Sequence, residues 1–375
     1  MRILVCPDKF AGTLGAPAVA EAVVAGWREQ APGDELTARP LSDGGPGFVE
    51  VLAGPVGGTL LPVRTTDPLG RPVDAQVLLS QDRRTAYVES AQACGLHLLE
   101  SSERDPKITT SYGLGVLILA AVEAGARTVV IGLGGSATND GGAGMLAALG
   151  AAPLDATGAA LPYGGAALAH ADRLGAVPMT RGATLVGATD VDNPLTGLHG
   201  ASSVYGPQKG ADRADVLLLD AALERFAGVL VKDLPACPPD LAALPGAGAA
   251  GGLGAAILAL GGRCESGIGL VTRMIGLETA LDAADLVITG EGSFDHQSLR
   301  GKVVAGVAGG ARDRGLPCVV LAGRVTTGRR EAANAGVTET YSLVDHFGDE
   351  AQAMARPADG LRELASRLAR QWSRQ

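Results

Sequence analysis

The chain has 375 residues, of which 46% are hydrophobic but only 3% aromatic, and its formal net charge is −9 at pH 7. This length suits about two domains, whose cores must consist mainly of Ala, Val and Leu. Such an acidic chain argues against a nucleic-acid partner or an anionic membrane surface, since both require clustered positive charge. A locally positive pocket could still bind a small anion.

The five cysteines are odd in number, far apart and without a CxxC pair, so neither a disulfide framework nor a zinc site is indicated. We expect buried free thiols in a reducing, cytoplasmic environment. Only Ile3 to Cys6 form an apolar run before Asp8, which is too short for a signal peptide. The uncharged stretch 241–262 is rich in glycine, so a closely packed buried helix is expected there rather than a membrane span.

Two predicted strands near the N-terminus each lead into an aspartate. Residues 1–6 form the first, followed by Asp8 and a helix over 18–27, and residues 36–41 form the second, followed by Asp43. Ligands of parallel α/β sheets lie at the carboxyl ends of strands, so both aspartates are candidates for one cleft. Each aspartate alone is equally compatible with helix capping or turn formation.

The sequence pattern changes from alternating strands and helices to β-rich segments at residues 60–90. Three alternating or β-rich segments, at 59–64, 73–79 and 85–89, are separated by turn signals. This pattern predicts an antiparallel meander and a new domain that starts near residue 60.

The stretch 128–145 is the central motif of the chain. A β-branched run, Thr128 to Ile131, predicts a buried strand, and the glycines that follow force a tight turn before a helix that begins near Met145. Backbone N–H groups and the helix dipole make such a turn suitable for an anion. The alternative is a tight strand–helix connection without a ligand, but the polar run Ser136 to Asp140 favours a phosphate or substrate loop.

A second acidic loop follows the predicted strand 184–188. Asp190 and Asp192 supply two carboxylates at i and i+2, which suit Mg²⁺ or the acceptance of a hydroxyl proton. The alternative interpretation is turn chemistry before Pro194. Lys209 then lies between turn residues in a chain with few lysines, which suggests a specific role for its point charge.

The C-terminal part predicts another βαβ unit. A strand over 285–289 leads to Glu291, and a second strand spans 318–323. The fold class is therefore α/β: a doubly wound, Rossmann-like domain formed by both chain ends, with a second α/β domain inserted in the middle.

Several motifs in this order resemble those of the bacterial type 1 glycerate kinases, over nearly the full length of the chain. The matching stretches are Pro7-Asp8, Phe10, Asp43-Gly44-Gly45, Pro68-Leu69-Gly70, Thr109-Thr110-Ser111-Tyr112-Gly113, the run 134–142, the run 190–195, the run 206–210, the run 245–252 and Thr289-Gly290-Glu291-Gly292. The resemblance implies ATP-dependent phosphorylation of D-glycerate, with 2-phosphoglycerate favoured over 3-phosphoglycerate, by a cytoplasmic monomer or homodimer. It also implies that residues 1–60 and 280–375 form the Rossmann-like domain and residues 61–279 the inserted one, with the active site in the cleft between them.

This resemblance also suggests roles for individual residues. Asp190 and Asp192 are expected to hold Mg²⁺ or orient the glycerate hydroxyl, and Lys209 to neutralise the transferring phosphoryl group. The residues expected to contact the cofactor ATP or its metal are Gly134, Gly135, Ser136 and Glu291. Those expected to contact the substrate are Asp8, Lys9, Asp43, Ser111, Asn139 and Asp140.

Two departures from the family pattern leave other functions open. Ala11 stands where the family usually has lysine, and Pro46 and Phe48 stand where it has glutamate and threonine. A non-catalytic glycerate- or nucleotide-binding paralogue is one alternative. Another is an NAD-dependent oxidoreductase of a small hydroxy acid that uses the glycines of the central motif, although Asp155, the acidic residue at a suitable spacing, has no convincing strand before it.

Overall fold

The computed structural model describes residues 1–296, 298–299 and 303–373. The chain divides into two compact units. Unit 1 comprises residues 1–43, 50–55 and 268–375, and unit 2 comprises residues 44–49 and 56–267. Helices α2 (Phe48–Val56) and α9 (Gly267–Ile275) have residues in both units.

Unit 1 contains a five-stranded sheet in the order β13-β12-β11-β1-β2, in which every neighbouring pair is parallel. Its strands are β1 (Arg2–Pro7), β2 (Glu35–Ala38), β11 (Leu286–Phe294), β12 (Cys318–Val325) and β13 (Glu339–Ser342). The predicted strands at 1–6, 285–289 and 318–323 are therefore present, and segments from both chain ends pair as β1 and β11. From β1 the next strand, β2, lies on one side, whereas β12 and β13 follow β11 on the other side. The strand order therefore reverses between β1 and β11, which makes this a topological switch point.

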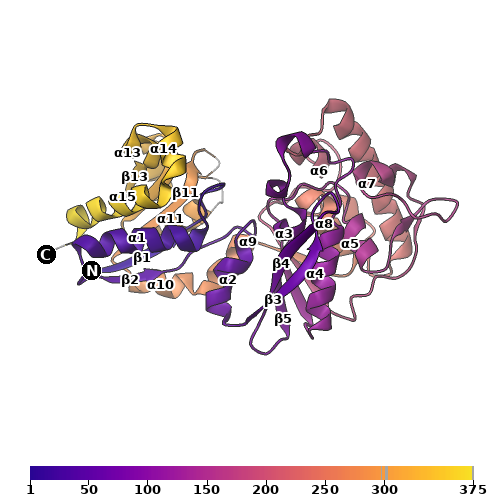
Figure 1. Ribbon diagram of the computed structural model, residues 1–375, viewed down its shortest axis with the longest axis horizontal. Coiled ribbons are helices and arrows are strands. Elements are labelled where there is room, and N and C mark those ends of the chain that lie inside the picture. Colours follow the sequence, from indigo (N-terminus) through magenta and orange to yellow (C-terminus); the bar gives the residue numbers. More distant parts are fainter. Residues whose placement is uncertain (297, 300–302, 374–375) are drawn as a thin grey trace. The chain divides into compact units, whose positions relative to one another are not determined.

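Helices cover both faces of this sheet, as an all-parallel sheet requires. They are α1 (Ala16–Gln30), α10 (Leu277–Ala283), α11 (Val303–Asp313), α12 (Arg329–Asn334), α13 (Leu343–Phe347), α14 (Glu350–Ala355) and α15 (Pro357–Trp372). The indigo α1 and the yellow α15 lie side by side although they come from opposite ends of the chain (Figure 1). Trp27 of α1 and Leu364 of α15 are buried in one core with the strand residues Val5 and Ile288, while α11 contacts β1, β11 and β12.

Unit 2 contains a six-stranded mixed sheet in the order β10-β9-β6-β5-β4-β3. Its strands are β3 (Thr59–Thr66), β4 (Pro72–Leu79), β5 (Thr85–Glu89), β6 (Thr128–Gly132), β9 (Thr184–Ala188) and β10 (Arg263–Glu265). The first three form the predicted antiparallel meander, and β5, β6, β9 and β10 run parallel. The carboxyl ends of four strands therefore meet at one edge, where the polar loops of the central motif begin. A separate two-stranded pair consists of β7 (Pro153–Leu154) and β8 (Arg173–Leu174).

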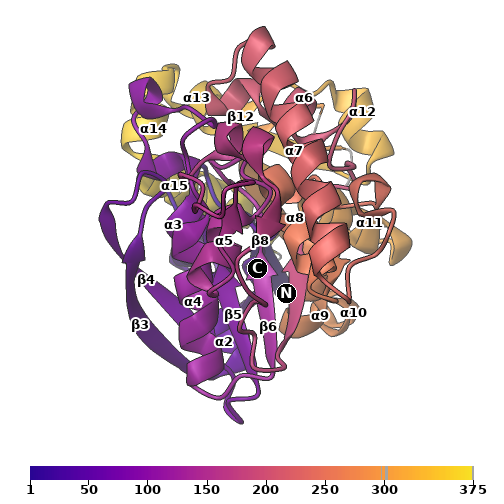
Figure 2. The same ribbon diagram turned by 90° about the vertical axis from the view of Figure 1, so that its right-hand side faces the viewer.

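The helices of unit 2 are α3 (Ala91–Cys94), α4 (Tyr112–Glu123), α5 (Ala143–Ala148), α6 (Ala201–Tyr205), α7 (Arg213–Asp233) and α8 (Ala249–Ala259). Short 3₁₀ helices are η1 (Leu96–Leu98), η2 (Ser101–Glu103), η3 (Gly165–His170), η4 (Pro207–Lys209) and η5 (Leu241–Ala243). Helix α4 contacts β3 to β6 and packs against α5 (Figure 2). Leu117 of α4, Met145 of α5, Phe226 of α7 and Ile257 of α8 belong to the same apolar core.

Within the uncharged stretch 241–262, the buried helix is α8, and the glycines near its start approach a loop rather than another helix. Ala250, Gly251 and Gly252 have left-handed backbone angles that kink α8. A Cβ on Gly251 would lie 1.9 Å from the carbonyl oxygen of Thr138. In the described part of the chain, no helix is both long and apolar enough to cross a membrane.

Candidate functional site

Three charged side chains meet at the carboxyl end of β1 in unit 1. The Lys9 ammonium lies 3.2 Å from Oδ1 of Asp43 and 3.6 Å from Oδ1 of Asp8. Burial raises the pKa of the Asp8 carboxyl, the Asp43 carboxylate adds to this rise, and Lys9 opposes it. For Lys9, burial alone would lower the pKa, but the two carboxylates outweigh it and raise the pKa above its usual value. Lys9 is therefore held as a cation at the end of the strand.

These three residues line a pocket of about 430 Å³, a volume within the range of about 300–1,000 Å³ typical of ligand sites. Glu291, in β11, lines the same pocket. The structure thus places Asp8, Lys9, Asp43 and Glu291 together at the switch point of the unit 1 sheet. Ala11, which stands where the family usually has lysine, also lines the pocket. Lys9 therefore supplies a positive charge to the same pocket.

In unit 2, the glycine turn after β6 is packed against the segment that contains Pro46. The Gly134 N–H donates to the carbonyl oxygen of Gly44 over 3.0 Å. A Cβ on Gly134 would lie 2.6 Å from Cα of Gly45, and one on Gly135 would lie 2.9 Å from Cδ of Pro46. This differs from the expectation that Gly134 offers its N–H to an anion, because a backbone carbonyl already occupies that donor. No hydrogen bond of the Gly135 or Ser136 N–H to another described residue is present.

Glu89, the last residue of β5, binds the segment that contains Pro46 at Gly47 and Val49. It is buried, and its Oε2 accepts hydrogen bonds from the backbone N–H groups of Gly47 and Val49. Glu89 is not among the predicted site residues, although it is a carboxylate at the end of a predicted strand, like Asp8 and Asp43.

Lys209 lies beneath the central loop and is only 2% exposed. Its ammonium donates to Oγ of Ser136 over 3.0 Å and to the carbonyl oxygen of Thr138 over 2.7 Å. Burial lowers the pKa of Lys209 to about 7, and the neighbouring carboxylate of Asp140 opposes this shift. The structure thus differs from the expected direct contact with a phosphoryl group, because both observed bonds of the ammonium hold the loop in place.

Asp140 and Ser111 form a second buried network under the same loop. The Asp140 carboxylate accepts hydrogen bonds from the N–H and the hydroxyl of Ser111 and from the N–H groups of Gly142 and Gly144. Burial raises the pKa of Asp140, and these donors oppose the shift. Both side chains are fully buried, so the structure supports positioning of the start of α5 rather than the expected contact with a substrate.

Asn139 is also fully buried. Its amide nitrogen donates to Oγ of Ser202 over 2.9 Å, whereas its Oδ1 and Oγ1 of Thr138 have no hydrogen-bond partner among the described residues. A buried water is the group that could satisfy these two oxygens without a change in the loop.

Asp190 and Asp192, by contrast, are exposed in the loop that follows β9. Oδ1 of Asp190 accepts a hydrogen bond from the Ser266 hydroxyl over 2.7 Å, which links the carboxyl ends of β9 and β10. No group of three or more His, Cys, Asp or Glu residues in the described ranges could hold a metal ion. Mg²⁺ commonly takes only one or two protein carboxylates and completes its shell with water and phosphate oxygens, so this pair fits such an ion.

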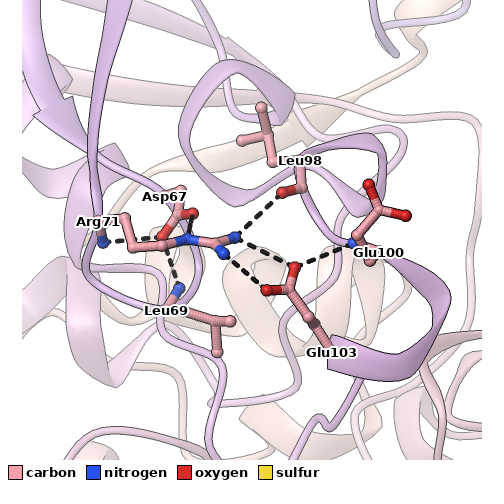
Figure 3. Close-up of polar contacts among 6 residues, drawn as sticks. All are labelled: Asp67, Leu69, Arg71, Leu98, Glu100 and Glu103. Carbon is pink, nitrogen blue, oxygen red and sulfur yellow. Dashed lines mark hydrogen bonds and ion pairs between the residues drawn. The ribbon is translucent and has the colours of Figure 1, made fainter.

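An ion-pair network in unit 2 connects Asp67, Arg71 and Glu103. Figure 3 shows the Arg71 guanidinium between Asp67 and Glu103, with Nη1 of Arg71 2.7 Å from Oε1 of Glu103 and its Nε 2.5 Å from Oδ2 of Asp67. The other carboxylate oxygen of Asp67 accepts the backbone N–H groups of Leu69 and Arg71. The turn between β3 and β4 is thereby tied to η2, which precedes the segment that leads to α4.

Comparison with known proteins covers almost the whole chain. Residues 3–373 match the pattern of the glycerate kinase family. The chain is 41% identical over 377 residues to the glycerate 2-kinase of Escherichia coli strain K12, covering 98% of each protein. It is also 41% identical over 380 residues to the glycerate kinase of Bacillus subtilis strain 168, again covering 98% of each. A crystal structure assigned as a glycerate kinase 2 from Salmonella typhimurium LT2 superposes with a TM-score of 0.81 at 40% identity, over 99% of this chain and 98% of that one. The predicted α/β fold class is thereby confirmed.

Proposed function

The chain belongs to the glycerate kinase family, and from this premise we propose that it transfers the γ-phosphoryl group of ATP to D-glycerate to form 2-phosphoglycerate. The observation that carries the proposal is the 41% identity to a glycerate 2-kinase over 98% of both proteins. Membership of the type 1 subgroup, a requirement for Mg²⁺, and a monomeric or homodimeric state in the cytoplasm are further parts of this proposal.

Phosphoryl transfer requires positioning and charge neutralisation more than covalent chemistry. We propose that the N–H groups of Gly135 and Ser136 bind an anionic oxygen at the carboxyl end of β6. Lys209 would act through Ser136 and Thr138, whose positions its ammonium fixes. Asp140 would act through the start of α5 in the same way.

Asp190 and Asp192 are the proposed acidic groups of the reaction. One carboxylate would accept a hydrogen bond from the glycerate hydroxyl and so orient that oxygen for attack. The same pair would hold Mg²⁺, which when bound neutralises charge on phosphate oxygens. In unit 1, Lys9 would donate a hydrogen bond to a neutral hydroxyl oxygen of a bound reactant, with Asp8 and Asp43 fixing its position, and Glu291 would contribute a further carboxylate.

The oxidoreductase alternative finds less support. A dinucleotide fingerprint needs glycines whose backbone is open to a pyrophosphate, whereas the segment 44–46 packs directly on this glycine turn. Asp155 follows the two-residue strand β7, which pairs with β8 in an antiparallel way and bridges the nearby residue Ala160, also antiparallel. That geometry does not present a carboxylate to a ribose at the edge of a parallel sheet.

The proposed function is tested by ADP release from Mg-ATP, coupled to NADH oxidation, in the presence and absence of D-glycerate. Phosphorus NMR of the product then identifies the phosphorylated hydroxyl. Glycerate-dependent ADP release with a 2-phosphoglycerate product would support the proposal. ATP binding without turnover would instead select the non-catalytic paralogue.

We expect Asp192→Asn, and separately Asp190→Asn, to lower kcat by about 100-fold, since each removes a charge that the reacting groups require. Circular dichroism should remain unchanged because both positions are exposed. Asp74→Asn on β4 is the matched control, an exposed carboxylate that pairs with Arg64 and with no other residue that the structure describes. A loss of less than about threefold in both site variants would contradict these roles.

A further inference from the structure

The pocket of unit 1 has an apolar wall as well as the charged end formed by Asp8, Lys9, Asp43 and Glu291. The wall consists of Leu343 and Val344 of α13, Ala353 and Met354 of α14, and Pro357 at the start of α15. D-glycerate has three carbons, each of which carries an oxygen, so it has no apolar surface to place against this wall. The base of ATP is the one flat, weakly polar surface among the proposed reactants, and binding there would remove it from water.

The charge of the pocket gives a second, independent indication. Among the described residues that line it, five are acidic and two are basic. Lys9 lies between Asp8 and Asp43, and the Arg324 guanidinium forms an ion pair with Glu350. An acidic lining repels a triphosphate or a carboxylate, but it accepts hydrogen bonds from neutral hydroxyl groups. A nucleoside combines such hydroxyls with an apolar base and carries no charge.

The position of the pocket agrees with this chemistry. Asp8 follows β1 and Glu291 lies in β11, so the charged end lies at the switch point of the parallel sheet, where α/β folds bind ligands. The apolar wall comes from α13, α14 and α15, which follow the edge strand β13 in the sequence. The Arg324–Glu350 ion pair links β12 to α14.

We propose that this pocket of unit 1 binds the adenosine part of ATP, with the base against Val344 and Met354 and the ribose hydroxyls donating to carboxylates of the charged end. This inference rests on the proposed kinase function for the identity of the nucleotide. It therefore places the nucleoside part of ATP in unit 1.

The methionines allow a direct test, because the chain has only five of them. Met354 in the pocket wall is 56% exposed, and Met179 in unit 2 is 55% exposed and does not line this pocket, so Met179 is a matched reference. Protein labelled with ¹³C at the methionine methyl groups would be titrated with adenosine, Mg-ATP and magnesium tripolyphosphate. Met354→Leu and Met179→Leu assign the two resonances.

We expect adenosine and Mg-ATP to shift the Met354 resonance, with no shift at Met179, and tripolyphosphate to leave Met354 unchanged. Val344→Ser combined with Met354→Ser should weaken adenosine binding and raise the KM for ATP about tenfold, with the KM for D-glycerate unchanged. If saturating Mg-ATP leaves Met354 unshifted, the nucleoside pocket is overturned, even in an enzyme that turns over glycerate. A Met354 shift without glycerate-dependent ADP release would support the pocket and count against the kinase reaction alone.

Discussion

Gly251→Ala is expected to lower the free energy of unfolding by about 3 kcal/mol, through left-handed backbone strain and overpacking together. Gly251 has a φ of +69°, and an added Cβ would lie 1.9 Å from the carbonyl oxygen of Thr138 and 2.7 Å from Cα of Asn139. Both neighbours are backbone atoms of the central loop, so neither can rotate away. The Gly251 carbonyl also accepts the N–H of Gly141, which ties the kink of α8 to the loop. Activity should therefore fall together with stability.

Urea unfolding followed by circular dichroism measures this change, and Gly228→Ala is its control. Gly228 lies inside α7, is exposed, and has no atom within 4 Å of an added Cβ. Alanine there should raise the free energy of unfolding by about 0.5–1 kcal/mol, because it improves helix propensity without a clash. Equal effects of the two substitutions would contradict the close approach at Gly251.

The sequence predicted most of the strands because their signal is local. Alternating or β-branched runs identify β1, β3, β4, β5, β6, β9, β11 and β12 within a few residues. The rule that ligands gather at the carboxyl ends of parallel strands likewise anticipated that Asp8 and Asp43 line one pocket. Both inferences need only the periodicity of a segment and the residue that follows it.

Contacts between distant segments could not be predicted in this way. Glu89 holds the N–H of Gly47, 42 residues earlier in the chain, and Lys209 reaches Ser136 across 73 residues. A motif alone also does not tell whether its polar side chains face a ligand or the interior. Ser111 and Asp140 have the residue types of a binding loop, but the fold uses their hydrogen bonds to fix the start of α5.

Lys209→Met is expected to lower kcat by about 100-fold, an effect comparable to the loss of a preorganised group in an active site. Methionine fills a similar volume but donates no hydrogen bond, so Oγ of Ser136 and the Thr138 carbonyl would lose the ammonium that holds them. The loop would then no longer present its Gly135 and Ser136 N–H groups in a fixed arrangement. Lys232→Met is the control, because Lys232 is an exposed lysine of α7 whose ammonium donates to the Asp172 carbonyl over 3.2 Å and to no other described residue.

The same substitution has a signature in the pH dependence of stability. Burial lowers the pKa of Lys209 to about 7 from 10.5, with Asp140 and Cys94 as the titratable groups that oppose the shift. Between these two values the unfolded chain binds a proton that the folded chain does not, so Lys209 makes the free energy of unfolding rise with pH. Below this window Lys209 is charged in both states, and the full penalty of burying the ammonium applies.

Lys209→Met should therefore lose more stability, relative to the wild type, at about pH 9 than at about pH 7. A difference that stays constant over this range, measured by urea unfolding with Lys232→Met alongside, would show that the Lys209 ammonium is not held in the interior.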